Sequence, residues 1–400
     1  MSVNSIPELR RDRRVNAAAP IVAYGDRSVL RVPRHVHALG AKRVLLMCGR
    51  RSFEVSGASA MLPDLELVAK VQRWSDFAPN TDSADLRIGL DVMRQFEPDV
   101  VIGVGGGSAM DMAKLLCGFR DVADDHVLDR IRSGLKTQTR RERLVLVPTT
   151  SGSGAEATHF AVVYIGDEKY SIGGDAMRPD VIALDPTLAV SGSPYQRATS
   201  GMDAVCQAIE SLWAVSATDR SRRFALVALR TLLPAIERFV NDPDSLSAHA
   251  MSLGSHLSGR AIDISRTTAA HALSYGLTKR YGISHGHAVA LTVPAFIAAH
   301  GASPSSRLQP TVTPAGHQRA MRTVVAALSA TSAVEARARF RVLTHALGLR
   351  HTIESDMSPD LIADQLVATV NAERLANNPV RFTPAELRSL VINSLTEQTP

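Results

Sequence analysis

The stretch DVVIGVGGGSAMDMAKLL, residues 99–116, decides the fold class. Its apolar run predicts a strand that leads into three glycines at residues 105–107, and Ser108 then opens an amphipathic helix. Asp111 completes an S-x-x-D signal for the start of that helix. Glycines let the backbone approach a ligand closely, and a helix N-terminus offers unpaired N–H groups to a phosphate. The stretch therefore predicts a strand–turn–helix unit that cradles a phosphate.

This cradle differs from two common phosphate-binding patterns. The G-x-G-x-x-G pattern is absent, because Ser108 stands where the third glycine after Gly103 and Gly105 would be. The GK[ST] ending of a P-loop is also absent. A tight strand-to-helix turn without a ligand would need the same glycines, so the glycines alone leave both interpretations open.

A second polar loop, PTTSGSGAE at residues 148–156, follows directly after another expected strand. It combines hydroxyl side chains with flexible glycines at the carboxyl end of the predicted sheet. Open α/β sheets bind their ligands outside that end. The loop is therefore a second candidate for ligand binding, and a polar loop without a ligand is the alternative.

Strand and helix patterns alternate through the first half of the chain, which favours a parallel sheet with helices on both faces. One helix is predicted over residues 83–98, with Ser83 as its N-cap and Pro98 beyond its end. The expected buried strands are RVLLMCG (43–49), LELVAKVQ (65–72), DVVIGVG (99–105) and RLVLVPTT (143–150). After about Pro194 the strand signals fade and helical periodicity takes over, as in residues 223–240 and 334–349. We therefore predict an α/β domain over residues 1–193 and an all-α domain over residues 194–400.

The composition is that of an ordinary globular protein. The 400 residues are 45% apolar, 21% charged and 4% aromatic, with a net charge of +6. The densest basic run, RRDRR at residues 10–14, is expected to be a solvated tail, so the charge gives no basis for nucleic-acid binding. A modest positive charge suits a small anionic substrate or a phosphorylated cofactor.

The three cysteines, Cys48, Cys117 and Cys206, are widely spaced and form no C-x-x-C pair. They predict neither a disulfide scaffold nor a thiolate zinc site, and they favour a reducing cytoplasm. The N-terminus has no apolar core typical of a signal peptide. The most apolar later run is interrupted by Pro294 and is too short for a membrane span, so no membrane association is expected.

The second half holds a set of metal-ligating residue types. In GMDAVCQAIES, residues 201–211, Asp203 and Gln207 lie one helical turn apart on one face. His271 follows in a helical pattern, and His285 comes fourteen residues later in a glycine-rich loop. A catalytic divalent site needs three or four N/O ligands, which these residues would supply. Each histidine taken alone would also suit an ordinary helix core.

These blocks in this order resemble the iron-containing, or group III metal-dependent, alcohol dehydrogenase family. The resemblance rests on GGGSAMDMAK, on PTTSGSGAE, on the spacing of Asp203 and Gln207, and on the spacing of His271 and His285. It runs from about Val44 to about His300. It implies a Rossmann-like dinucleotide-binding domain followed by a helical metal-binding domain, the dehydroquinate synthase-like architecture, and a homodimer.

The resemblance also implies roles for individual residues. The pyrophosphate of the cofactor would be held by Gly105, Gly106, Gly107 and Ser108. The nicotinamide side would be lined by Thr149, Thr150 and Ser151, and Lys169 would approach the ribose. The metal ligands would be Asp203, His271 and His285, either to Fe²⁺ or to Zn²⁺. The family usually has a histidine at the position of Gln207, whose amide oxygen would coordinate more weakly.

A closer resemblance narrows the substrate. QAIESLW (207–213), ATHFAVVY (157–164) and the segment 267–291 are similar to phosphonoacetaldehyde reductases, a branch that shares Gln207. That branch reduces phosphonoacetaldehyde to 2-hydroxyethylphosphonate in phosphonate natural-product pathways. A phosphonate calls for cationic partners, for which Arg266 and Lys279 are candidates, although exposed helix charges are the alternative. There are two alternatives: a general short-chain aldehyde reductase of the same family, and a nucleotide-binding homologue that has lost catalysis.

The resemblance also bears on cofactor choice and on the source of the proton. Gly49 stands where NADH-preferring relatives carry an acid for the ribose 2′-OH, and Arg50 and Arg51 follow it, so we expect NADPH to be used at least as well as NADH. The proton for the product alkoxide would pass through Tyr275, which stands where many relatives have a histidine, through His287, through water or through the ribose hydroxyls.

Overall fold

The computed structural model describes residues 19–134, 136–353, 355–370 and 372–396. The basic run at residues 10–14 lies outside them. The chain divides into two compact units, Met1–Gly192 and Ser193–Pro400. Each unit is described by itself.

The first unit is built on a six-stranded parallel sheet with the order β1-β8-β5-β4-β2-β3. The strands are β1 (Ile21–Tyr24), β2 (Arg43–Cys48), β3 (Lys70–Trp74), β4 (Val100–Gly105), β5 (Arg143–Pro148) and β8 (Val181–Leu184). The register pairs Cys48 of β2 with Val104 of β4, and Val104 in turn with Val147 of β5. The loops that follow these three strands therefore start at the same edge of the sheet.

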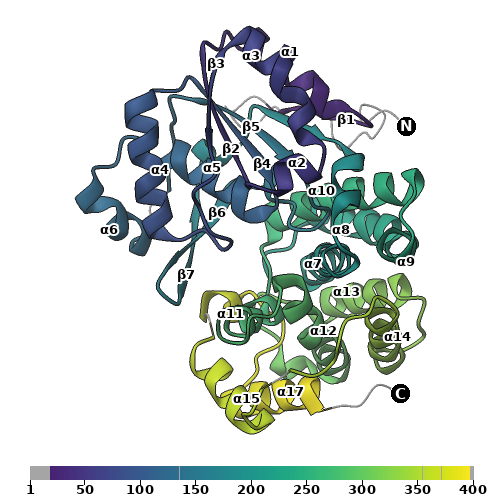
Figure 1. Cartoon of the computed structure of the whole chain (residues 1–400). Helices are drawn as coiled ribbons and strands as arrows, with labels where there is room; N and C mark the ends of the chain where they lie inside the picture. Colours follow the sequence, from purple (N-terminus) through teal and green to yellow (C-terminus); the bar gives the residue numbers. More distant parts are fainter. Residues whose placement is uncertain (1–18, 135, 354, 371, 397–400) are drawn as a thin grey trace. The chain divides into compact units, whose positions relative to one another are not determined.

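Helices cover both faces of this sheet (Figure 1). One face packs against α4 (Ser83–Phe96), α5 (Gly107–Phe119) and α6 (Val127–Arg132), and the other against η3 (Ser28–Arg31), α1 (Val32–Ala38), α2 (Ser52–Val55), η4 (Ala58–Met61) and α3 (Leu62–Val68). Alternate strand residues serve the two cores: Leu45 and Met47 belong to the first, and Leu46 and Cys48 to the second. Burial on both faces explains why the central strands β2, β4 and β5 read as continuous apolar runs.

Two details of the predicted elements are wrong. LELVAKVQ is not one strand: residues 62–68 form α3, and the strand begins at Lys70. The helix starts with a proline at its N-terminus, and Leu67 is 84% exposed, so the apolar pattern crosses an element boundary. The N-cap of α4 is Asp82, whose side chain accepts from the Ala84 N–H, whereas Ser83 is the first helical residue.

A two-stranded antiparallel hairpin extends this unit. It consists of β6 (Phe160–Ile165) and β7 (Glu168–Gly173), joined by a turn with Gly166 at φ +59°. The fully buried Lys114 of α5 holds the chain that enters the hairpin, because its Nζ donates to the carbonyl oxygens of Thr158 and Phe160 at 2.9 Å each. The sequence patterns did not predict this hairpin.

The second unit is helical in its described residues, apart from one bridge between Leu308 and Val380. Its helices are α7 (Pro194–Trp213), α8 (Asp219–Leu232), α9 (Ile236–Asn241), α10 (Ser245–Ser265), α11 (Ala269–Tyr281), α12 (His285–Ala302), η9 (Ser305–Arg307), α13 (Pro314–Ala327), α14 (Ala333–Ala346), α15 (Pro359–Ala368), α16 (Ala372–Ala376) and α17 (Pro384–Thr396). Helix α7 packs against α8, α10 and α12 and is buried over most of its length (Figure 1). Among the described residues, none of the helices has the length and apolarity that a membrane crossing requires.

A buried histidine, His300, lies in the last turn of α12. The His300 ring stacks on Phe382, and its Nε2 accepts from Asn378 Nδ2 at 3.2 Å. Burial, together with the neighbouring His317, lowers the pKa of His300 from 6.5 to about 3, against a smaller opposing effect of the Asn378 bond. This imidazole is therefore neutral in the folded protein between pH 5 and pH 7.

Replacing His300 tests that statement. Between pH 7 and pH 5 the unfolded chain gains a proton at this residue and the folded chain does not, so the free energy of unfolding falls by about 2 kcal/mol from His300 alone. In His300→Phe that part of the fall disappears, as measured by urea unfolding at both pH values. The exposed His126→Gln is the control, and an unchanged pH dependence in His300→Phe would contradict the assignment.

Candidate functional site

Three side chains of the second unit converge on one point. Ligand atoms of Asp203, His271 and His285 all lie within 4.8 Å of one another. Asp203 Oδ1 is 3.3 Å from His271 Nε2 and 3.9 Å from His285 Nε2. Asp203 and His271 are buried, while the His285 side chain is 33% exposed, which leaves one side accessible. One carboxylate and two imidazoles form the donor set of a catalytic divalent site with an open position.

Both imidazoles are held so that Nε2 faces Asp203. His271 Nδ1 contacts the Glu210 carboxylate, which can only accept, so Nδ1 carries the proton. Ser274 Oγ donates to the His271 carbonyl at 2.7 Å and therefore accepts from His285 Nδ1 at 3.3 Å. Partners of this kind orient metal-ligating histidines and set their tautomer. The residues present therefore fit a divalent cation between the two Nε2 atoms and Asp203.

Glu210, which the sequence patterns did not single out, is fully buried. Besides His271, its carboxylate accepts from Thr268 through the backbone N–H at 3.1 Å and Oγ1 at 2.5 Å. Burial would raise the pKa of Glu210, but His271 and these hydrogen bonds lower it. Its position seven residues after Asp203 on one helix was the available signal, because residues two turns apart share a face.

The charges around His271 explain its protonation. Burial alone would lower the pKa of His271, but Glu210 and Asp203 outweigh burial and raise it to about 10. The extra proton lies on Nε2, toward Asp203 Oδ1. A divalent cation would take the place of that proton.

Gln207 lies one turn beyond Asp203 on α7 and is buried. Ser258 Oγ lies 3.2 Å from its Oε1, and the same hydroxyl donates to the Ala204 carbonyl at 2.8 Å. The hydroxyl has a single proton, so the Ala204 carbonyl and the Gln207 amide oxygen compete for the same donor from α10. Its part as a fourth ligand stays a prediction.

The two residues proposed for proton transfer have different surroundings. The Tyr275 ring stacks on His285, with centroids 5.9 Å apart and an interplanar angle of 21°. His287 Nε2 lies 2.7 Å from the Arg350 carbonyl, which can only accept, so Nδ1 accepts from the Tyr195 hydroxyl at 3.1 Å. Burial lowers the pKa of His287. Tyr195, which the sequence analysis missed, is 44% exposed and is the solvent-facing end of this pair.

The two substrate candidates, Arg266 and Lys279, lie on either side of His271 along the chain. Arg266 is the C-cap of α10 and has Asp263, Glu373 and Arg374 as charged neighbours. Lys279 is exposed in the last turn of α11, eight residues beyond His271, which corresponds to roughly 12 Å along the helix. Their role in binding an anion stays a prediction.

The first unit contains a cavity of about 720 Å³ at the carboxyl edge of its sheet. It lies where β2, β3 and β4 end, beside the point at which the strand order reverses, the usual ligand position in open α/β sheets. Its lining includes Gly49, Arg50, Ser52, Asp76, Asp85, Gly105, Gly106, Gly107 and Ser108. The glycine cradle and the residues after β2 therefore line one cavity.

The loop after β5 adjoins the cradle. Thr149 N donates to the Gly105 carbonyl at 2.9 Å. A Cβ at Gly106 would lie 3.5 Å from Thr150 Oγ1, and one at Gly107 would lie 3.1 Å from Ser153 Cβ. Thr149 and Ser151 are buried. The contact at Gly106 is ordinary, whereas that at Gly107 is tight, so Gly107 is where the absence of a side chain lets the hydroxyl-rich loop approach the cradle closely.

The predicted S-x-x-D start of α5 is wrong. The helix begins at Gly107 with Gly106 as N-cap, and Ser108 Oγ instead accepts from the Asn80 N–H at 3.0 Å. Asp111 accepts from the Val162 N–H at 3.0 Å. Burial raises the pKa of Asp111 to about 6, against the opposing effect of Lys114, the Val162 bond and Lys169. Lys169 thus lies near Asp111, on β7.

Glu210→Gln tests the orientation of His271. The amide keeps the volume but loses the charge that holds Nδ1, so we expect zinc affinity to fall by about 10–100-fold. Calorimetric titration with Zn²⁺ measures this, and the exposed Glu237→Gln is the control. Unchanged affinity in a folded Glu210→Gln protein would show that this carboxylate does not position the ligand.

Gly286→Ala tests the contact that brings His285 to Asp203. A Cβ at Gly286 would lie 1.9 Å from the Thr199 carbonyl oxygen and 2.9 Å from Asp203 Cβ, so α12 must move away from α7. We expect a loss of about 1–3 kcal/mol of stability together with loss of bound metal, measured by thermal unfolding and metal analysis. In Gly316→Ala the new Cβ meets only the Thr313 hydroxyl, and both quantities should stay near wild type. Full metal content in Gly286→Ala would contradict the close-approach argument.

Comparisons with known proteins match both units. A family model described as iron-containing alcohol dehydrogenase matches residues 19–186, and one described as Fe-containing alcohol dehydrogenase family, C-terminal, matches residues 197–395.

Two curated relatives show what the chain is similar to. It is 34% identical over 222 residues to phosphonoacetaldehyde reductase of Streptomyces viridochromogenes, covering 53% of this chain and 56% of the relative. It is 31% identical over 263 residues to long-chain-alcohol dehydrogenase 1 of Geobacillus thermodenitrificans, covering 65% of this chain and 66% of that relative. The matched regions thus span from just over half to about two thirds of these relatives.

Solved structures share the fold. The structure of sulfoacetaldehyde reductase from Bifidobacterium kashiwanohense in complex with NAD+ is similar with a TM-score of 0.81 at 23% identity, covering 95% of this chain and 98% of that one. An iron-containing alcohol dehydrogenase from Thermotoga maritima gives 0.79 at 24% identity, covering 94% and 98%.

Proposed function

The chain belongs to the iron-containing alcohol dehydrogenase family, and we propose that it reduces a small anionic aldehyde to the alcohol with NADPH or NADH and a divalent metal. The observation that carries this proposal is the convergence of Asp203, His271 and His285, with both histidines oriented through Nε2. The cavity at the glycine cradle of the first unit supports the dinucleotide.

The substrate we propose is phosphonoacetaldehyde, reduced to 2-hydroxyethylphosphonate in a phosphonate natural-product pathway. The similarity to phosphonoacetaldehyde reductase supports it. So does Gln207, which the resemblance to that branch implies and which is buried one turn from Asp203 on α7. The long-chain-alcohol dehydrogenase relative favours the second candidate, a reductase of uncharged aldehydes.

The roles of the residues follow from their contacts. A bound divalent cation supplies Lewis-acid polarisation of the carbonyl oxygen, and a reduced nicotinamide supplies the hydride. Asp203, His271 and His285 would hold the cation, while Glu210 and Ser274 keep each Nδ1 protonated and each Nε2 directed inward.

Two hydroxyl groups of the second unit are candidates for giving the alkoxide its proton. Tyr275 lies beside the accessible ligand His285. Tyr195 is the second, and its hydroxyl would have to turn away from His287 Nδ1, to which it donates, in order to protonate the alkoxide. Only Tyr275 contacts a proposed ligand through a ring stack, so we place it first.

The compartment and assembly stay predictions. Cys48, Cys117 and Cys206 are free and buried, which suits the reducing cytoplasm that we expect. A homodimer is expected from the family resemblance alone.

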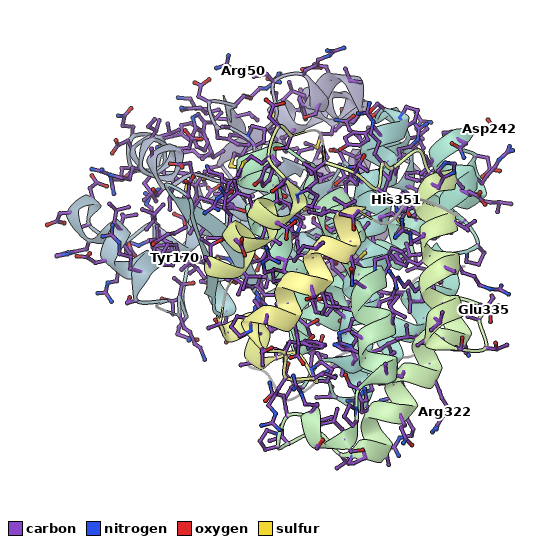
Figure 2. The ribbon with its side chains drawn as sticks, turned by 90° about the horizontal axis from the view of Figure 1, so that it is seen from below. Arg50, Tyr170, Asp242, Arg322, Glu335 and His351 are labelled. Carbon is purple, nitrogen blue, oxygen red and sulfur yellow. The ribbon has the colours of Figure 1, made fainter. Side chains whose placement is uncertain are left out.

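A substrate panel tests the function. After reconstitution with iron(II), zinc or manganese, kcat/KM for phosphonoacetaldehyde should exceed that for an uncharged aldehyde of similar size by about tenfold or more, since a phosphonate adds charge-assisted hydrogen bonds. Lys279→Ala should raise KM for the phosphonate substrate and leave KM for the uncharged aldehyde unchanged. The exposed Arg322→Ala on α13, labelled in Figure 2, is the control. Equal kcat/KM values for both aldehydes would favour the general reductase.

A further inference from the structure

The end of the cavity beside β2 and β3 lacks the acid that dinucleotide folds place there. In such folds a carboxylate at the end of the strand next to the glycine-cradle strand bonds the ribose 2′-OH, and here β2 is that neighbour of β4. Here the residue after β2 is Gly49, and a Cβ at this position would lie 2.3 Å from Ser52 Oγ. A side chain at position 49 would only need the Ser52 hydroxyl to turn aside, so what distinguishes this end of the cavity is the absence of a carboxylate at residue 49.

An oppositely charged pair occupies the same end of the cavity. Arg50 and Asp76 both line it and form an ion pair with each other. Asp76 follows β3, which pairs with β2 through Met47 and Trp74, so the carboxylate comes from the neighbouring strand. Both side chains are mostly exposed, at 74% and 65%, and Arg50 lies at the outer edge of the first unit in Figure 2.

The backbone that carries Arg50 is fixed. Arg73 Nη2 donates to the Arg50 carbonyl at 3.1 Å, and Arg73 Nη1 donates to Glu54 at 2.9 Å. The other carboxylate of the cavity, Asp85, accepts from the Ala78 N–H at 2.8 Å and so holds the loop after β3. Asp76 is therefore the carboxylate that can change partners when a ligand enters.

We propose that the Arg50–Asp76 pair decides which dinucleotide this protein accepts. Asp76 accepts the hydrogen bond of the ribose 2′-OH of NADH and thus stands in for the acid missing at Gly49. Arg50 pairs with the 2′-phosphate of NADPH, to which guanidinium geometry is suited. An exposed ion pair contributes little, so either ligand separates the two side chains at small cost. This inference rests on the proposed function, since it concerns the cofactor of that reaction.

Substituting the two members of the pair should change the relative affinity for NADPH and NADH in opposite directions. Asp76→Asn removes a charge that repels the 2′-phosphate and releases Arg50, so Kd for NADPH should fall by about tenfold and Kd for NADH should rise several-fold. Arg50→Gln should raise Kd for NADPH by about tenfold and leave Kd for NADH nearly unchanged. Arg51→Gln is the matched control, because Arg51 is not among the residues that line the cavity.

Calorimetric titration of each full-length protein with NADPH and with NADH, in the absence of aldehyde, is the experiment. The proposal is supported if the ratio of the two Kd values moves in opposite directions in Asp76→Asn and Arg50→Gln and stays constant in Arg51→Gln. It is overturned if both dinucleotides bind but the ratio is unchanged in the first two variants, or moves equally in the third. Failure of the wild-type protein to bind either dinucleotide would instead count against the proposed function. Because both side chains are exposed, circular dichroism should show folded variants.

Discussion

A buried imidazole held between two carboxylates is the interaction on which the helical unit depends. His271 meets Glu210 through Nδ1 and Asp203 through Nε2, and all three side chains are buried. Both acids come from α7, seven residues apart on one face, so a single helix sets the geometry on both sides of the ring. Removing either charge would leave the other buried groups without their partner, which is costly. The geometry is therefore sensitive to substitution of any of these three side chains, and the two carboxylates suit it to a cation.

The close approach of α12 to α7 completes that arrangement. Gly286 lies against the Thr199 carbonyl, with no room for a side chain, and this contact brings His285 beside Asp203. Ser274 then fixes the tautomer of His285 from α11. Three helices thus contribute one ligand each and their neighbours set the orientation. In the first unit, the parallel register positions the loops of the candidate cofactor site, because it brings the ends of β2, β4 and β5 to one edge of the sheet.

The sequence predicted features that depend on local residue pattern, and it did not predict roles that depend on contacts between segments distant in the chain. The apolar runs and the glycines at residues 105–107 predicted the parallel sheet and its cradle. The prediction of one strand over residues 65–72 was wrong, because the leucines of this segment belong to a helix that ends just before an exposed edge strand. Glu210, Ser274 and Tyr195 escaped notice, since nothing in their local sequence shows what they touch across the fold. Asp76 is a similar case, as its meeting with Arg50 depends on strand order.

X-ray absorption at the zinc edge, on the protein reconstituted with one equivalent of zinc, tests the central claim most directly. The account predicts a single ion coordinated by two imidazoles and at least one carboxylate oxygen, with one imidazole lost in His271→Ala and one in His285→Ala. A zinc spectrum that shows the same number of imidazoles in the wild type and in both variants would place the metal elsewhere and contradict it.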